Sequence, residues 1–203
     1  MQVTEITELS KAKVNVFIDN EFAFVLYKGE LRTYKLKAGE EISENVYHQI
    51  VDEVLVKRAK LRCMNLLKSR DYTRFQLATK LKQGLYSDEV IQQALDYVAS
   101  YHYIDDARYA EDYVRYGLQT KSKKQVMLEL RKKGVSSEII EDAMMRCDNE
   151  TEDKEAELIK KLLVKKKYMA ATATREDKSK IVAFLYRKGF SLDKIHTIIG
   201  EID

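Results

Sequence analysis

The sequence predicts a mainly α protein in which three tandem three-helix modules form an elongated array after a small N-terminal β-hairpin or sheet region. The 203 residues contain no proline and only seven glycines, so few positions interrupt a helix. Charged residues make up 34% of the chain and tryptophan is absent, which disfavours a large buried sheet. A helix–glycine–helix pattern recurs three times, and modules joined in series contact mainly their neighbours.

The β region is predicted to cover residues 1–42. Apolar residues alternate along KVNVFID and EFAFVLY, which places on the buried faces of two strands Val14, Val16, Ile18, Phe22, Phe24 and Leu26. Asp19 and Asn20 lie between the two runs, and both residue types tolerate the positive φ of a two-residue hairpin turn. Weaker strand patterns cover residues 3–9 and 31–36. A lone hairpin is marginally stable, so this region must pack on something else.

From Ser43 onward the apolar spacing becomes helical. Ser43 can cap a linking helix that starts at Glu44, with Val46, Ile50 and Val54 at four-residue steps. The linking helix and the first module are predicted to cover residues 43–104. The second and third modules follow at residues 105–150 and 151–203.

The repeat is anchored on Gly84, Gly134 and Gly189, which lie 50 and 55 residues apart. Each glycine is expected to end a helix in the left-handed conformation, after a basic residue that faces the negative helix end: Lys82, Lys132 or Arg187. An apolar anchor follows directly: Leu85, Val135 or Phe190. Next come a capping serine (Ser87, Ser137, Ser191) and an acidic residue (Asp88, Glu138, Asp193), which start the next helix. That helix buries a β-branched residue: Val90, Ile140 or Ile195.

Each glycine also ends a capped middle helix. Thr73 with Gln76 and Ser122 with Gln125 fit the capping box, whereas Thr174 with Asp177 fits it less well. A further helix precedes each middle helix, over residues 57–68, 106–119 and 154–167. Each module is therefore predicted to hold three helices.

The repeat resembles the RecX regulatory proteins, the bacterial modulators of the RecA recombinase. The resemblance covers residues 57–200 and rests on KRAKLRCMNLLKSRDYTRFQLATKLKQGLYSDEVIQQALDYV, YIDDARYAEDYVRY and KKQVMLELRKKGVSSEIIEDAM. Residues 1–42 are similar to the extension of the longer family members. Two positions depart from the family pattern: Gln76 replaces the usual glutamate, and Ser122 lies near a common glycine. The resemblance implies three modules lodged in the groove of a RecA–DNA filament, inhibition of its ATPase, strand-exchange and coprotease activities, and no chemistry by the protein itself.

The residues themselves point to no enzyme, and no cofactor or metal is expected. The sequence lacks a Walker A loop and the GxGxxG, GxSxG and HExxH motifs. His48, His102 and His196 are far apart along the chain. Asp105 and Asp106 are better explained as helix-start charges than as metal ligands. The two cysteines, Cys63 and Cys147, are expected to be small reduced core or near-core residues, and an active site assembled across modules stays an open alternative.

Basic clusters lie on the predicted helices of the second and third modules. Residues 154–203 carry twelve basic and seven acidic side chains. Because successive helix residues turn by about 100°, a run of lysines cannot face one surface, and part of each cluster is solvated. Repetition nevertheless favours contact with an acidic protein groove or a phosphate backbone. The predicted partner-binding residues are Lys123, Lys124, Arg131, Lys132, Lys133, Lys165, Lys166, Lys167, Arg187 and Lys188.

Tyrosines recur at helical spacing near the boundary between the first two modules: Tyr97, Tyr101, Tyr103, Tyr109, Tyr113 and Tyr116. A packed stripe between those modules is the favoured interpretation. An exposed patch that binds a partner or stacks on unpaired bases is the alternative.

The leading hypothesis is a regulator of recombination and of the SOS response whose partner is the RecA filament, with single- or double-stranded DNA as an additional partner. A helix-turn-helix-like DNA-binding protein is the alternative, although the third helices carry a poor set of base-reading residues: Gln92, Gln93, Glu141, Asp142 and His196. A location in the cytoplasm with no membrane partner is expected, because the start of the chain lacks an apolar signal segment and the longest uncharged run, residues 97–104, is far too short to span a bilayer. A monomer is expected as the default for an elongated regulator. The sequence leaves open the direction of regulation, the dominant module and the role of the β region.

Overall fold

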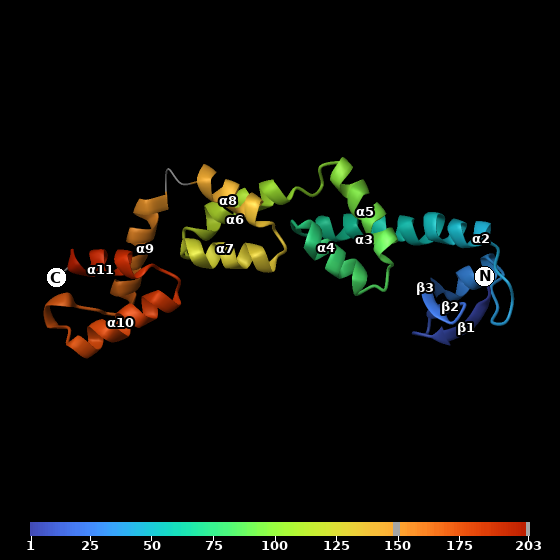
Figure 1. Cartoon of the computed structure of the whole chain (residues 1–203), viewed down its shortest axis with the longest axis horizontal. Coiled ribbons are helices and arrows are strands. Elements are labelled where there is room, and N and C mark those ends of the chain that lie inside the picture. The colour runs from blue at the N-terminus through green and yellow to red at the C-terminus, as the bar shows by residue number, and fades with distance from the viewer. Residues whose placement is uncertain (148–150, 202–203) are drawn as a thin grey trace. The chain divides into compact units, whose positions relative to one another are not determined.

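The computed structural model describes residues 1–147 and 151–201, which belong to two compact units, Met1–Asp105 and Asp106–Asp203 (Figure 1). The first unit contains, in order, β1 (Val3–Glu8), β2 (Lys13–Ile18), β3 (Glu21–Tyr27), α1 (Lys28–Thr33), α2 (Glu44–Gln49), the π-helical turns η1 (Ile50–Val56), α3 (Lys57–Leu67), α4 (Arg74–Lys82) and α5 (Asp88–Ser100). The second contains α6 (Asp106–Gly117), α7 (Lys123–Lys132), α8 (Ser137–Arg146), α9 (Thr151–Lys165), the short 3-10 turn η3 (Ala170–Thr172), α10 (Arg175–Arg187) and α11 (Leu192–Gly200). Among the described residues, no helix is long and apolar enough to span a membrane.

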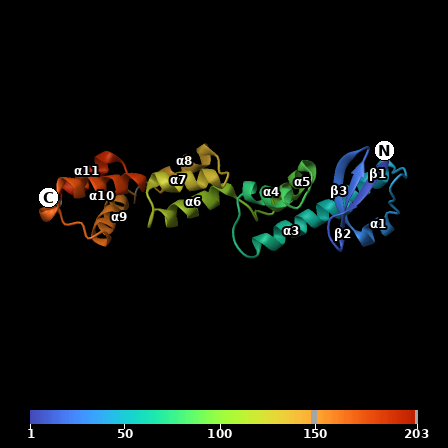
Figure 2. The same cartoon turned by 90° about the horizontal axis from the view of Figure 1, so that it is seen from below.

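The three strands form an antiparallel sheet in the order β1-β2-β3 (Figure 2). Asp19 and Asn20 have φ values of 50° and 69°, so the predicted hairpin turn is confirmed. Val16 pairs with Phe24 and Phe17 pairs with Phe22, which leaves an extra residue in β3. This bulge turns Phe22 out of the buried face, where it was predicted, and against the edge of the Phe17 ring.

The strand predicted at residues 31–36 is wrong, because residues 28–33 form helix α1. A Glu30 carboxylate oxygen accepts a hydrogen bond from the Tyr27 backbone N–H at 2.7 Å and so caps the first turn. The same oxygen accepts from the Arg58 guanidinium at 2.7 Å. This ion pair between α1 and α3 favours the helix over the alternating pattern of the local sequence.

Residues 44–67 form one uninterrupted helical run from α2 through η1 to α3, and the Ser43 hydroxyl caps it as predicted. Its apolar face supplies Ile50, Leu55 and Val56 to a core that also contains Phe24 and Leu26 of the sheet. The hairpin therefore packs on the linking helix, and the core continues into α4 and α5 of the same unit.

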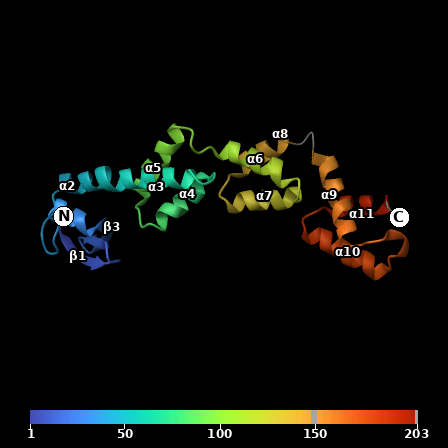
Figure 3. The ribbon, with the colours of Figure 1, turned by 180° about the vertical axis from the view of Figure 1, so that it is seen from behind.

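The three predicted modules are present as α3–α5, α6–α8 and α9–α11. Each has its own buried apolar residues, represented by Leu81, Leu130 and Leu185, all fully buried. The close packing of the third module is visible in Figure 3, where α9, α10 and α11 lie together. The β-branched residues predicted for the module cores, Val90, Ile140 and Ile195, are likewise fully buried.

The turn between the second and third helices differs in the first module from the prediction. Gly134 and Gly189 adopt positive φ, whereas in the first module Leu85, at φ 60°, takes this role instead of Gly84. Leu85 is 43% exposed and is not an apolar anchor. The backbone N–H of Tyr86 closes the turn on the Leu81 carbonyl, as Val135 does on Leu130. Leu85 is thus the structural equivalent of the two later glycines.

The same comparison between modules corrects the predicted N-cap of α8. Ser136, and not Ser137, caps α8, with its hydroxyl accepting from the Ile139 N–H at 3.3 Å. Ser87 and Ser191 cap α5 and α11 as predicted. Thr73–Gln76 and Thr174–Asp177 both form complete capping boxes. At Ser122 only half of the box is present, because the Gln125 side chain donates to Glu129 at 3.4 Å instead.

Candidate functional site

The candidate site lies in the second unit, where α7 meets the third module. Ser122 is 1% exposed and has two roles: its hydroxyl caps α7 by accepting from the Gln125 N–H, and it donates to the Lys188 carbonyl at 2.7 Å. A Cβ at Gly189 would lie 2.6 Å from the Ser122 hydroxyl oxygen, so glycine permits this close approach.

Glu155 adds a buried charge to the same junction. It is 5% exposed, and its two carboxylate oxygens accept from the Lys123 backbone N–H and from the Lys194 ammonium, both at 2.8 Å. A buried carboxylate is tolerable only with such partners. The pair fixes α7 and α11 to α9 and leaves the Lys194 side chain at the edge of the surface described next.

We use the name junction groove for a cavity of about 600 Å³ between α7 and the third module. Its apolar lining includes Met127, Leu128 and Phe190, and Leu128 is 52% exposed. Its cationic lining includes Lys124 and Arg131, with Lys194 opposite on α11. Exposed apolar side chains surrounded by cations are typical of a surface that binds an acidic protein partner.

The basic surface continues beyond the junction groove. A second cavity of about 480 Å³ shares Lys124 and Tyr186 with it and adds Arg187 and Lys188. A third, which we name the α10 cavity, measures about 560 Å³, lies within the third module and shares Phe184 and Arg187 with the second. Basic and aromatic side chains therefore alternate along one connected surface of this unit.

Several of these cations make cation–π contacts with aromatic rings. The Lys124 ammonium lies 6.0 Å from the centre of the Tyr186 ring, and the Lys166 ammonium lies 4.6 Å from that of Phe184. Lys188 lies 6.0 Å from the same Phe184 ring. Cation–π contacts of this kind orient a charge without neutralising it.

The predicted partner-binding residues divide into two groups. The connected surface brings together Lys123, Lys124, Arg131, Lys166, Lys167, Arg187 and Lys188. It does not include Lys132 and Lys165, which are exposed, or Lys133, which is half-buried over the rings of Tyr109 and Tyr113. The prediction from sequence missed Lys194, Leu128, Phe184 and Tyr186. Aromatic residues between the basic residues of α10 were the available signal for the last two.

Near Lys133, a half-buried network joins Tyr113, Lys121 and Glu129. One Glu129 carboxylate oxygen accepts from the Lys121 ammonium at 2.5 Å and from the Tyr113 hydroxyl. The Lys121 bond, followed by the Tyr113 bond, lowers the pKa of Glu129. The bond to Glu129 raises the pKa of Lys121, and burial first and then the Glu129 bond raise the pKa of Tyr113. Lys121 is therefore engaged within the second module.

The tyrosines do not form one continuous stripe within either unit. Tyr109 and Tyr113 are half-buried against the second module's core with stacked rings, while Tyr116 is 66% exposed. In the first unit the rings of Tyr101 and Tyr103 stack at 5.8 Å and are largely exposed. The predicted stripe between the first two modules concerns the arrangement of the two units and stays a prediction.

The residues considered for catalysis or metal binding provide no assembled centre in the described part of the chain. No group of three His, Cys, Asp or Glu side chains there has the arrangement of a metal site. Helix α6 begins at Asp106, with Asp105 directly before it. Both cysteines are free; Cys63 is fully buried, and burial raises the pKa of its thiol to about 11.

Comparison with known proteins identifies relatives along almost the whole chain. Models of the first, second and third three-helix domains of RecX match residues 59–97, 105–144 and 152–199. The Regulatory protein RecX of Caldanaerobacter subterraneus subsp. tengcongensis is 32% identical over 98% of this chain and 99% of its own length. That of Clostridium acetobutylicum is 25% identical over 98% of this chain and 94% of its own.

Two solved structures agree with these relatives. A crystal structure described as that of regulatory protein RecX aligns with a TM-score of 0.66 at 27% identity, covering 97% of this chain and 98% of its own. The crystal structure of RecX from Lactobacillus salivarius aligns with a TM-score of 0.62 at 31% identity, covering 73% of this chain and 97% of its own. The similarity therefore includes the sheet region as well as the three modules.

Proposed function

The chain belongs to the RecX family of regulatory proteins, and we propose that it regulates homologous recombination and the SOS response by binding the RecA nucleoprotein filament. Binding inhibits the ATPase, strand-exchange and coprotease activities of the filament. The protein itself catalyses no reaction and needs no cofactor.

The observation that carries this proposal is the connected basic and aromatic surface of the second unit. Lys124, Arg131 and Lys194 surround an apolar groove whose volume of about 600 Å³ accommodates side chains of a protein partner. Beyond it, Arg187 and Lys188 extend the positive charge toward the α10 cavity. A filament of protein and DNA offers both acidic side chains and phosphates, and this surface can attract either.

Direct reading of duplex DNA fits the surface less well. A recognition helix needs Arg, Asn or Gln side chains that reach base edges. The third helix of the second module instead exposes Glu141 and Asp142, which phosphates repel, and that of the third module exposes His196. The cations are concentrated on α7, α10 and the end of α9, and they favour contact with backbone phosphate or protein over base reading.

The test is ATP hydrolysis by RecA assembled on single-stranded DNA. We expect added protein to lower turnover in a concentration-dependent manner, while the protein alone hydrolyses no ATP. Turnover that stays constant across a wide range of concentrations would contradict the proposal. Preference for one duplex sequence over random DNA at fixed salt would favour the helix-turn-helix alternative instead.

A further inference from the structure

The α10 cavity of the third module has the features of an anion site. Four basic residues line it, Lys166, Lys167, Lys180 and Arg187, against one acidic residue, Asp177. The Asp177 carboxylate is already engaged, because one of its oxygens accepts from the Thr174 backbone N–H at 3.1 Å and from the Thr174 hydroxyl at 2.7 Å. The charge that faces the cavity is therefore mainly positive.

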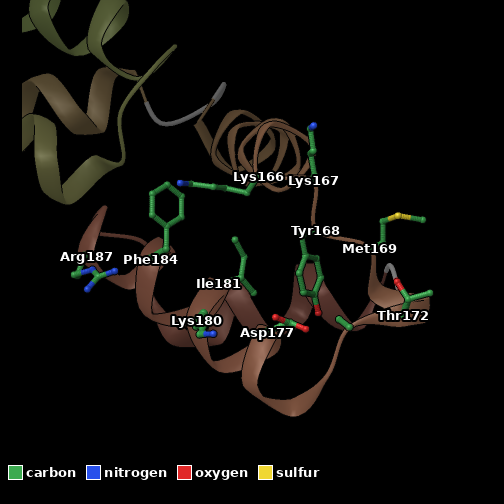
Figure 4. Close-up of a pocket in the computed structure, with 11 residues that line it drawn as sticks. Lys166, Lys167, Tyr168, Met169, Thr172, Asp177, Lys180, Ile181, Phe184 and Arg187 are labelled. Atoms are coloured by element: carbon green, nitrogen blue, oxygen red, sulfur yellow. The ribbon is translucent and has the colours of Figure 1, made fainter.

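The cations reach the cavity from different elements. Figure 4 shows Lys166, at the end of α9, extending over the cavity toward Phe184 of α10, whereas the neighbouring Lys167 points away. Lys167 has φ 55°, so the chain makes a left-handed turn directly after Lys166. Lys180 forms an exposed ion pair with Glu176 at 2.7 Å, while the described residues provide no ion-pair partner for Lys166 or Arg187.

Tyr168 adds a second and independent observation. Its hydroxyl oxygen is buried and has no hydrogen-bond partner among the described residues. Figure 4 places the ring at the cavity wall with the hydroxyl at the end nearest Asp177. Buried polar groups without a partner are rare, and a bound ion or water usually supplies what the protein does not. The hydroxyl can donate to an oxyanion once the side chains around it rotate to admit one.

We propose that the α10 cavity binds phosphate groups of a nucleotide at two positions: Lys166 and Arg187 are charged donors near Phe184, and the Tyr168 hydroxyl is a neutral donor near Asp177. The two positions are distinct because Asp177 and Arg187 lie ten residues apart on α10, about 15 Å along the helix axis. Lys166 and Tyr168 both lie on the segment between α9 and α10. The phosphate comes either from a single DNA strand or from a free nucleotide. This site goes beyond binding of the filament, and its test needs no recombinase.

The test is a titration of the full-length ¹⁵N-labelled protein, followed by amide NMR signals. The probes are inorganic phosphate, thymidine monophosphate and a short oligothymidylate. We expect each to shift the signals of Lys166, Tyr168 and Phe184. Tighter binding of the oligothymidylate than of the monophosphate identifies a DNA strand as the source, and the reverse identifies a free nucleotide. The absence of shifts at these residues with all three probes would overturn the proposal.

Two neighbouring lysines provide a matched control. Lys166→Gln and Lys165→Gln remove the same charge, but Lys166 extends over the cavity, whereas Lys165 is exposed and lines none of the cavities of the connected surface. We expect Lys166→Gln to weaken oligothymidylate binding by about ten-fold, the effect of one charge-assisted hydrogen bond, and Lys165→Gln by less than about three-fold. Equal weakening by the two variants would show diffuse attraction instead of a site.

Tyr168→Phe tests the hydroxyl without disturbing the fold. Because the hydroxyl has no partner, we expect the variant to melt no lower than the wild type and to bind inorganic phosphate about five-fold more weakly. Tyr116→Phe, at an exposed tyrosine of the second module, is the control and should change neither value. Unchanged phosphate affinity in Tyr168→Phe would show that the hydroxyl does not contact the phosphate.

A comparison of ligands tests the phosphate assignment itself. Tighter binding of an oligoglutamate peptide than of oligothymidylate would overturn the phosphate assignment in favour of an acidic protein segment.

Discussion

Lys167 has a backbone conformation that lysine tolerates poorly. Its φ of 55° lies in the left-handed region, where a side chain costs about 1–2 kcal/mol and glycine does not. Replacing Lys167 by glycine would remove this cost, but the greater entropy of glycine in the unfolded chain offsets part of the stability gained. We expect Lys167→Gly to raise the free energy of unfolding of the third module by about 0.5 kcal/mol, measured by hydrogen exchange of the α9 and α10 amides.

The control for this change is Lys161→Gly in the interior of α9. Lys161 is exposed and forms only a weak ion pair with Glu157 at 3.4 Å. We expect glycine at this position to lower the free energy of unfolding by about 1 kcal/mol, because glycine loses more backbone entropy than lysine when it is fixed in a helix. The account of Lys167 fails if both variants lose stability.

The network of Tyr113, Lys121 and Glu129 makes the second module sensitive to pH. The pKa of Glu129 is lowered in the folded chain from an ordinary value of 4.5, so its contribution is complete above that value and is lost as the pH falls through the lowered pKa. The raised pKa of Lys121 makes stability depend on pH in the opposite direction. Its contribution is complete below the ordinary value of 10.5 and is lost as the pH rises through the folded pKa.

We therefore expect Glu129→Gln to lower the free energy of unfolding by about 1 kcal/mol at neutral pH, because Lys121 and Tyr113 each lose an anionic partner. The difference from the wild type should shrink on acidification, when the wild-type carboxylate is itself protonated. Thermal unfolding across a pH series measures this difference. Tyr113→Phe keeps the packing and the bond between Lys121 and Glu129, so it should reduce the acid-dependent loss of stability without abolishing it. An undiminished difference at acid pH would rule out the network as its source.

At the scale of elements, one serine joins two modules. The Ser122 hydroxyl caps α7 and donates to the Lys188 carbonyl, whereas the Ser136 hydroxyl caps α8 and is exposed. We expect Ser136→Ala to cost about 1 kcal/mol, the loss of one cap. Ser122→Ala should cost about 2 kcal/mol, because it also removes the buried bond to Lys188.

Amide hydrogen exchange separates the two effects. Both variants should speed exchange at the first turn of their own helix. Only Ser122→Ala should also speed exchange at the end of α10, where the Lys188 carbonyl lies. Equal effects confined to α7 and α8 would show that the bond between the modules contributes no stability.

The elements show which features could be predicted from the sequence. Helix starts follow local chemistry, so Thr73, Ser87 and Ser191 were found as caps. The first-module turn was misplaced by one residue because Gly84 stands beside Leu85, and the glycine was the better local candidate. Helix α1 was predicted as a strand because its stabilising partner, Arg58, is distant in the sequence.

The candidate site was predictable in composition but not in geometry. Local sequence shows runs of lysine, and the helical turn implies that only some of each run face one surface. The left-handed turn at Lys167 could not be predicted, because no glycine occupies that position. The apolar lining, including Leu128, depends on how α7 meets the third module, and no local pattern encodes that contact.

At the scale of the whole molecule, the second unit concentrates the charge that the overall composition conceals. The net charge of the chain is only +3, yet Lys124, Arg131 and Lys194 line one groove, and Arg187 lies on the continuing surface. Cations gathered on a concave surface raise the local concentration of an anionic partner and its rate of association. The connected surface can therefore act on a filament although the protein as a whole is nearly neutral.

This charge distribution leads to the last prediction, on the variant Lys124→Gln/Arg131→Gln/Arg187→Gln. Each residue lines the connected surface, and no ion pair involving any of the three is found among the described residues. We expect the concentration needed for half-inhibition of RecA ATP hydrolysis to rise at least about ten-fold, since interfacial charges contribute mainly to association. Higher salt should weaken inhibition by the wild type more than inhibition by the variant, because the variant has fewer charges on this surface for salt to screen. The control removes the same charge from the sheet region, as Lys11→Gln/Arg32→Gln/Lys35→Gln, at three exposed residues. If this control loses as much inhibition as the groove variant, net charge and not the connected surface determines binding.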